Sequence, residues 1–69
     1  MTKFVIYRDK AGYWRWRLVA GNGEKVAASE AYVSEQNAVR SADRVRILAA
    51  SAQIVEESTL GLLSLLNRR

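Results

Sequence analysis

The chain has 69 residues, enough for one domain with a small core, because a domain of about 60 residues buries only about 60% of the surface its unfolded chain exposes. It contains no cysteine and no histidine, which excludes disulfides, thiolate chemistry and the usual zinc ligands. We therefore expect a partner subunit to supply the missing stability. Eleven Lys and Arg against seven Asp and Glu give a net charge of +4, which suits a polyanionic partner or solubility alone.

Nothing in the sequence predicts insertion into a membrane. No apolar stretch approaches the roughly 20 residues of a membrane-spanning helix, and the first residues lack the apolar run of a secretory signal. The expected location is the cytoplasm.

The first predicted strand runs from Lys3 to Arg8, where aromatic and β-branched residues lie between two basic ends. Alternation places Phe4 and Ile6 on one face and Val5 and Tyr7 on the other. The polar link after it, residues 9–12, contains a glycine and is short enough for a hairpin.

The second predicted strand has the clearest alternation in the chain. One side carries Trp14, Trp16, Leu18 and Ala20, and the other carries Tyr13, Arg15, Arg17 and Val19. A tight turn at residues 21–23 and a short third strand, from Lys25 to about Ala28, complete an antiparallel meander. The sheet should therefore have an apolar core face and a basic face.

A helix is predicted from about Glu35 to Ala49, with Ser34 as its N-cap. A stripe of mostly small side chains recurs at helical spacing and would let the helix lie close to the sheet. The stripe comprises Ala38, Ala42, Val45 and Ala49, widened by Leu48; the opposite face carries Arg40, Asp43, Arg44 and Arg46.

Two further elements are expected after this helix. Residues Ser51 to Glu56 are predicted to form a fourth strand, with Ala52 and Ile54 on one face and Val55 on the other. Residues 59–69 hold five leucines in a segment that suits a short helix, too short to cross a bilayer. We divide the chain into a domain at 1–57 and a leucine-rich segment at 58–69.

Several motifs resemble the YegP-like family, a domain of unknown function. They are KFVIY at residues 3–7, GYWRWRL at 12–18, NGE at 22–24, SEAYVS at 29–34 and RVR at 44–46. The resemblance extends from about Lys3 to Val55 and implies an α+β fold with the element order β-β-β-α-β. The leucine-rich end lies outside the family pattern.

The resemblance also implies an assembly. In YegP-like proteins two such units, in tandem or as two chains, build one continuous sheet by exchanging C-terminal strands, with both helices on one side. A single-copy chain should therefore be a homodimer with swapped fourth strands near residues 53–55. The exchange would remove an exposed sheet edge and enlarge a small core.

The sequence gives no support for catalysis. The seven acidic residues are scattered, histidine is absent, and no phosphate-binding loop, nucleophile elbow or metal-ligand cluster is present. We expect no enzyme activity, no catalytic or metal-binding residues and no cofactor.

Two binding hypotheses remain. In the first, the basic sheet face binds nucleic acid or another polyanion through Tyr7, Tyr13, Arg15 and Arg17. Neutralisation of that face by Asp9 or Glu24 would weaken this hypothesis.

In the second, the chain is a protein interaction module that acts through Leu60, Leu62, Leu63 and Leu66. The simpler interpretation of these leucines is that they cover the chain's own dimer, because each buried leucine contributes roughly 1.5–3 kcal/mol.

Overall fold

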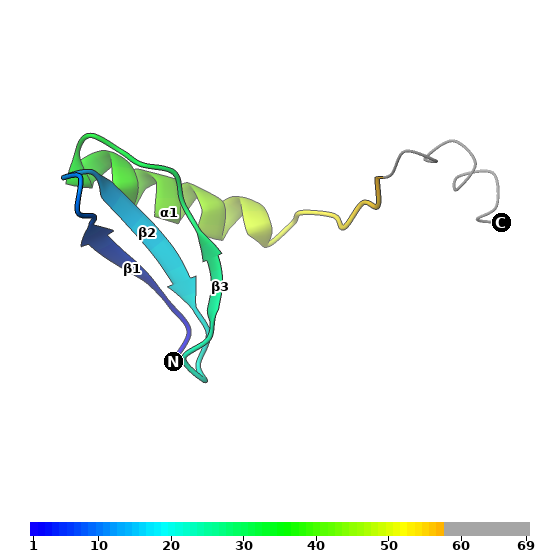
Figure 1. Cartoon of the computed structure of the whole chain (residues 1–69). Helices are drawn as coiled ribbons and strands as arrows, with labels where there is room; N and C mark the ends of the chain where they lie inside the picture. Colours follow the sequence, from blue (N-terminus) through cyan, green and yellow to red (C-terminus); the bar gives the residue numbers. More distant parts are fainter. Residues whose placement is uncertain (58–69) are drawn as a thin grey trace, which may run out of the picture.

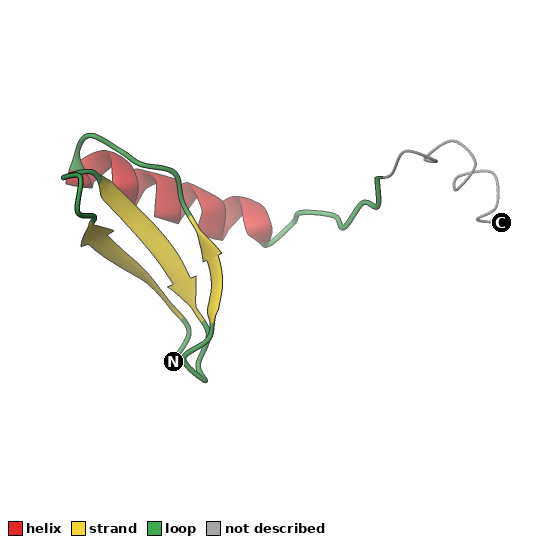
Figure 2. Ribbon diagram, viewed as in Figure 1, coloured by secondary structure: helices red, strands yellow, loops and turns green. Residues whose placement is uncertain are grey.

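A computed structural model of the chain describes residues 1–57. It contains a three-stranded antiparallel sheet in the order β1-β2-β3, formed by Lys3–Arg8, Trp14–Val19 and Lys25–Ala28. One helix, α1, spans Glu35–Ala49 and lies across one face of the sheet (Figures 1 and 2). The predicted α+β architecture, the meander and the helix are confirmed.

The strand register sorts the side chains into two faces as the alternation predicted. In β1 and β2, Phe4 lies opposite Leu18 and Ile6 lies opposite Trp16. Phe4 and Ile6 line a hollow together with side chains of the helix, and Trp16 donates a hydrogen bond to the helix residue Ser41, so this is the face that the helix covers. The rings of Phe4 and Trp16 meet edge to face with centroids 5.1 Å apart. Trp16 is only 5% exposed, so the central strand supplies the largest buried side chain of the core.

The helix begins where its capping residue predicts. The Ser34 hydroxyl accepts a hydrogen bond from the Asn37 amide at 3.1 Å, and Glu35 lies in the first turn near the positive end of the helix dipole. Ala38 is fully buried and Ala42 nearly so. Their small side chains let the helix backbone approach β1 and β2 closely.

Ser41 joins the helix to the rest of the domain. Its hydroxyl oxygen accepts hydrogen bonds from the indole Nε1 of Trp16 at 2.9 Å and from the Tyr32 hydroxyl at 2.7 Å. Tyr32 is also held by a backbone bridge to Trp14. The buried indole therefore has its polar partner, and β2, the segment before the helix and α1 meet at one side chain.

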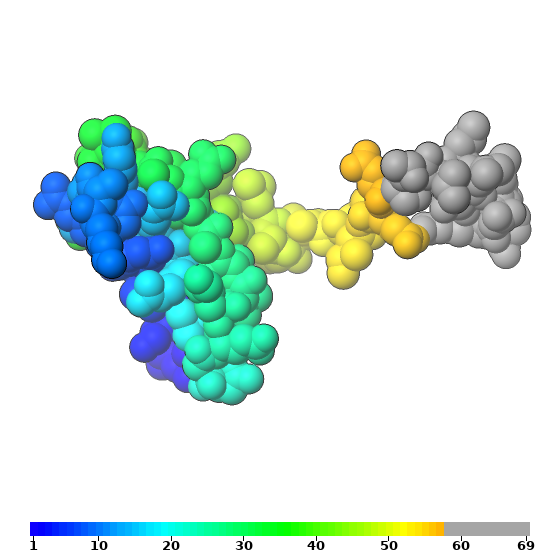
Figure 3. Space-filling model, in the orientation of Figure 1, coloured from blue at the N-terminus to red at the C-terminus, as the bar shows by residue number. Residues whose placement is uncertain are grey.

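The fourth strand predicted for Ser51 to Glu56 does not form within one chain. Residues 51–57 carry no strand assignment, and the segment projects from the body of the domain (Figure 3). Ile54 is completely exposed and Val55 largely so. A strand needs a neighbouring strand for its backbone hydrogen bonds, and this segment has no neighbouring strand within residues 1–57.

The C-terminal end of the predicted helix stripe is also uncovered. Val45 is half-buried, whereas Leu48 and Ala49 are exposed. The sheet therefore covers the first turns of α1 and leaves its last turns open. The predicted leucine-rich helix at 59–69 lies outside the described residues.

Candidate functional site

The face of the sheet that carries no helix brings three of the four candidate polyanion-binding residues together. Tyr7 lies opposite Arg15 in the register, and the next pair on the same face is Val5 and Arg17. Tyr13 precedes β2 and is exposed. We call this surface the helix-free face; it comprises Lys3, Val5, Tyr7, Arg15, Arg17, Val19 and Lys25.

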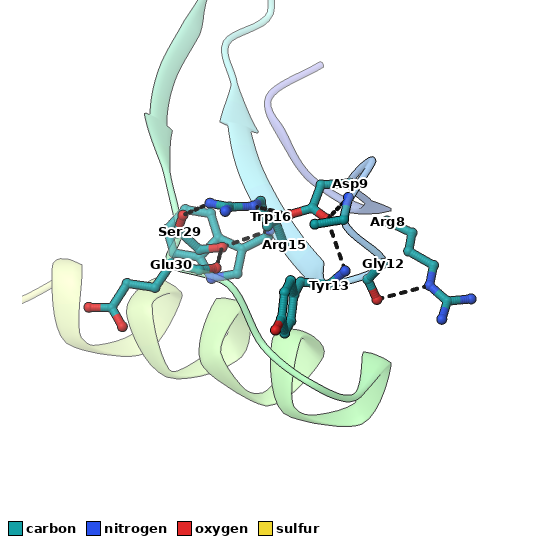
Figure 4. Close-up of polar contacts among 9 residues, drawn as sticks. Arg8, Asp9, Gly12, Tyr13, Arg15, Trp16, Ser29 and Glu30 are labelled. Carbon is teal, nitrogen blue, oxygen red and sulfur yellow. Dashed lines mark hydrogen bonds and ion pairs between the residues drawn. The ribbon is translucent and has the colours of Figure 1, made fainter.

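Arg15 is held in place by an acidic residue from the β1–β2 turn. Its Nε donates to Asp9 Oδ2 at 2.6 Å, and one terminal nitrogen lies 3.5 Å from the Ser29 carbonyl oxygen (Figure 4). Asp9 Oδ1 also accepts from the amides of Ala11 and Tyr13, both at 2.9 Å. The carboxylate therefore organises the turn and the arginine together.

These contacts stabilise the charged forms of both partners. The hydrogen bond from Arg15, with the bond from the Tyr13 amide next in importance, lowers the pKa of Asp9 below its ordinary value. The same hydrogen bond from Arg15 to Asp9 raises the pKa of Arg15. Arg15 thus links the turn to the end of β3, and its charge is largely neutralised.

Arg17 lies in different surroundings on the same strand. Its guanidinium carbon is 4.5 Å from the centroid of the Tyr7 ring, within the range of a cation–π contact. Within residues 1–57 it forms no ion pair with a carboxylate. The tyrosine ring orients the guanidinium group while its positive charge stays available to an anion.

Two lysines that were not among the predicted site residues lie on the same face beside Val19, the residue of β2 that follows Arg17 on this face. The register places Lys3 of β1 and Lys25 of β3 on either side of Val19, and both lysines are exposed. The placement of Lys25 depends on a register irregularity between Leu18 and Val19 in the β2–β3 pairing, whereas Lys3 follows the regular β1–β2 register. The sequence predicted the strand around each lysine, but it did not predict that Lys3, Val19 and Lys25 lie side by side across the three strands.

The polar residues that might suggest chemistry have structural partners. The Ser29 hydroxyl accepts from the Trp16 amide at 2.9 Å and donates to the Glu30 carbonyl at 2.7 Å. Arg8 stacks over Trp14 at 5.5 Å and donates to the Gly12 carbonyl. Within residues 1–57 no three His, Cys, Asp or Glu side chains gather as metal ligands.

Two other expectations concern membranes and the leucine-rich segment. In the part of the chain that the structure describes, no helix has the length and apolar character to span a membrane. The alternative candidate residues Leu60, Leu62, Leu63 and Leu66 lie outside that part.

Known proteins share this fold and sequence pattern. The solution structure of a protein from Haloferax volcanii matches with a TM-score of 0.74 at 35% identity, covering 81% of this chain and 95% of the other. The solution structure of a protein from Agrobacterium tumefaciens matches with a TM-score of 0.69 at 36% identity, covering 93% and 98% of the two chains.

A curated relative and a family model extend the similarity. A UPF0339 protein of Treponema denticola is 46% identical over 54 residues, which cover 78% of this chain and 93% of the relative. The family model described as a domain of unknown function, DUF1508, matches residues 9–56. This chain therefore belongs to the DUF1508 family, the YegP-like proteins whose motifs its strands and turn carry.

Proposed function

We propose that the domain is a non-catalytic, homodimeric binding module whose helix-free face binds single-stranded nucleic acid. The observation that carries this proposal is Arg17, oriented by Tyr7 and without a carboxylate partner in residues 1–57. Arg17 would contact phosphates, and Tyr13, which is exposed just before β2 and outside the helix-free face as defined, would stack a base beyond the edge of that face. Lys3 and Lys25 would add longer-range attraction.

The proposed roles of the two arginines differ. Because Asp9 neutralises Arg15 and holds it against the turn, Arg15 would shape the face and contribute little to phosphate binding. Arg17 would make the direct contact. This pairing of Asp9 with Arg15 lowers the positive charge of the face, so the expected binding is weak and tolerant of sequence.

Homodimer formation is supported by apolar surface that one chain leaves uncovered. Ile54 is completely exposed and Val55 is 77% exposed. Beside the edge strand β1 lies a hollow of about 240 Å³, lined in part by Phe4 and Ile6 of the sheet and Val39 and Ala42 of the helix.

Residues 52–55 of a second copy would suit this edge. As a strand beside β1 they would supply backbone partners for the edge and place Ala52 and Ile54 over the hollow. The exchange would be mutual, as the resemblance to YegP-like proteins implies. Two copies would also present two Arg17 side chains on one sheet, which raises affinity through paired contacts.

The test is fluorescence anisotropy with a labelled single-stranded oligonucleotide at two salt concentrations. The wild type should bind, with log affinity falling against log salt by a slope of about −0.7 per neutralised phosphate. Arg17→Gln should weaken binding and flatten that slope. Arg46→Gln is the matched control, because Arg46 lies on the helix and pairs with Asp43. No binding at low salt, or equal binding by Arg17→Gln, would overturn the proposal.

A further inference from the structure

The outer face of α1 carries a second surface with a defined chemistry. Arg40, Arg44 and Ile47 follow one another at i, i+4 and i+7, so they form a single stripe along the helix. This stripe points away from Ala38 and Ala42, which are buried against the sheet. It therefore lies on the opposite side of the molecule from the helix-free face.

The arginines of this helix are not equivalent. Arg46 is paired with Asp43, with 2.6 Å between its terminal nitrogen and the carboxylate oxygen. Arg40 and Arg44 are exposed and form no ion pair with any of residues 1–57. Two adjacent turns of the helix thus present two guanidinium groups that can accept an anionic partner.

Apolar side chains adjoin these two arginines. Ile47 is 57% exposed and Leu48 is 53% exposed. Together with Arg40, Asp43 and Arg44 they line an open hollow of about 350 Å³, large enough to receive one or two apolar side chains. We call this surface the outer helix groove.

We propose that the outer helix groove docks an acidic amphipathic helical segment of a partner protein. Carboxylates one turn apart on the segment would pair with Arg40 and Arg44, since residues at i and i+4 have matching separations on both helices. A leucine or isoleucine between them would enter the hollow against Ile47 and Leu48. The observation that selects this occupant is the combination of positive charge and apolar wall.

A nucleic acid fits this groove less well. Phosphates would satisfy the two arginines, but a sugar-phosphate backbone has no apolar side chain to cover Ile47 and Leu48. Among the described residues that line the groove, none is aromatic, so a base would find no ring on which to stack. Docking at this groove does not depend on the proposed nucleic-acid binding. It is also compatible with the proposed dimer, because two sheets joined edge to edge with their helices on one side would leave the outer stripe of α1 accessible.

The probe for this proposal is a fluorescein-labelled helical peptide of about 15 residues. It carries two glutamates one turn apart and two leucines on the same face. A control peptide has glutamine in place of both glutamates. Binding is measured by anisotropy with the full chain, and dimer formation is followed in parallel by sedimentation.

The acidic peptide should bind and the glutamine peptide should bind at least about fivefold more weakly, as expected for two exposed ion pairs. The Arg40→Gln/Arg44→Gln variant should bind the acidic peptide more weakly than the wild type by a similar factor. Ile47→Ser should weaken binding about threefold or more through lost apolar contact. Arg17 lies on the other side of the molecule, so Arg17→Gln should bind the acidic peptide with the affinity of the wild type.

Three outcomes would overturn the proposal. The first is equal binding of the acidic and glutamine peptides, and the second is an unchanged affinity in the Arg40→Gln/Arg44→Gln variant. The third is binding of an oligonucleotide of equal charge whose affinity falls in Arg40→Gln/Arg44→Gln but is unchanged in Ile47→Ser. That result would show that the groove is a general anion site. Circular dichroism of each variant checks that the fold is retained.

Discussion

The two halves of helix α1 carry the same apolar spacing in different surroundings. In the first half, Ala38 is fully buried, Ala42 nearly so, and Ser41 binds both Trp16 and Tyr32. In the second half, Leu48 and Ala49 continue the stripe but are exposed. Helical periodicity therefore identifies which side chains need covering, whereas only the tertiary structure shows whether the same chain covers them.

The largest expected effect lies in the anchored half. Trp16→Ala should destabilise the domain by about 3–5 kcal/mol, the range for a large buried aromatic side chain, which can unfold a domain of ordinary stability. Tyr13→Ala is the control, because Tyr13 is exposed and precedes the same strand. Equal shifts of the two variants in urea melts would show that Trp16 is not the centre of the core.

The next effect tests the link between helix and sheet. Ser41→Ala removes the acceptor of two part-buried hydrogen bonds and leaves the Trp16 Nε1–H and the Tyr32 hydroxyl without this partner. We expect a loss of about 1–3 kcal/mol in urea unfolding. Ser51→Ala, after the helix, should change stability little, and a comparable loss there would contradict the assigned role of Ser41.

A smaller effect should follow pH through Asp9. Its pKa is lowered in the folded domain, chiefly by Arg15, so this group stabilises the fold above its unfolded pKa of about 3.9. That contribution should disappear as the pH falls through the lower folded value. Asp9→Asn should abolish this part of the acid dependence of thermal stability, and an unchanged dependence would contradict the assignment.

The smallest effect is expected at the exposed pair of Asp43 and Arg46. Asp43→Asn should alter stability by no more than about 0.5 kcal/mol, as for exposed helix pairs one turn apart. A thermal melt beside that of Asp9→Asn compares the two carboxylates. A larger loss of stability in Asp43→Asn than in Asp9→Asn would contradict the conclusion that the carboxylate in the turn is structurally more important than the one on the exposed helix face.

Local signals carried most of the fold prediction. Strict alternation in β2 identified the buried face of Trp16, and Ser34 with Glu35 located the helix start. The fourth strand was different, because alternation indicates an extended segment and says nothing about where its hydrogen-bonding neighbour comes from. Within residues 1–57 of one chain, the segment 51–57 has no neighbouring strand.

The candidate site likewise has a part that local sequence patterns predict and a part that only the tertiary structure shows. Alternation correctly grouped Tyr7, Arg15 and Arg17 on one face. The pairing of Arg15 with Asp9 depends on the shape of the turn, which folds the carboxylate back over the strand. The position of Lys25 opposite Val19 depends on a register shift between β2 and β3 that no local sequence pattern predicts.

Sedimentation equilibrium of the full chain tests the central claim, that a second copy pairs its exposed segment 52–55 with the free edge of β1. The wild type at micromolar concentration should show twice the chain mass of 7.8 kDa, and Ile54→Lys, which puts a charge on the exposed segment, should show the mass of one chain. A stably folded wild-type monomer of 7.8 kDa would contradict the claim.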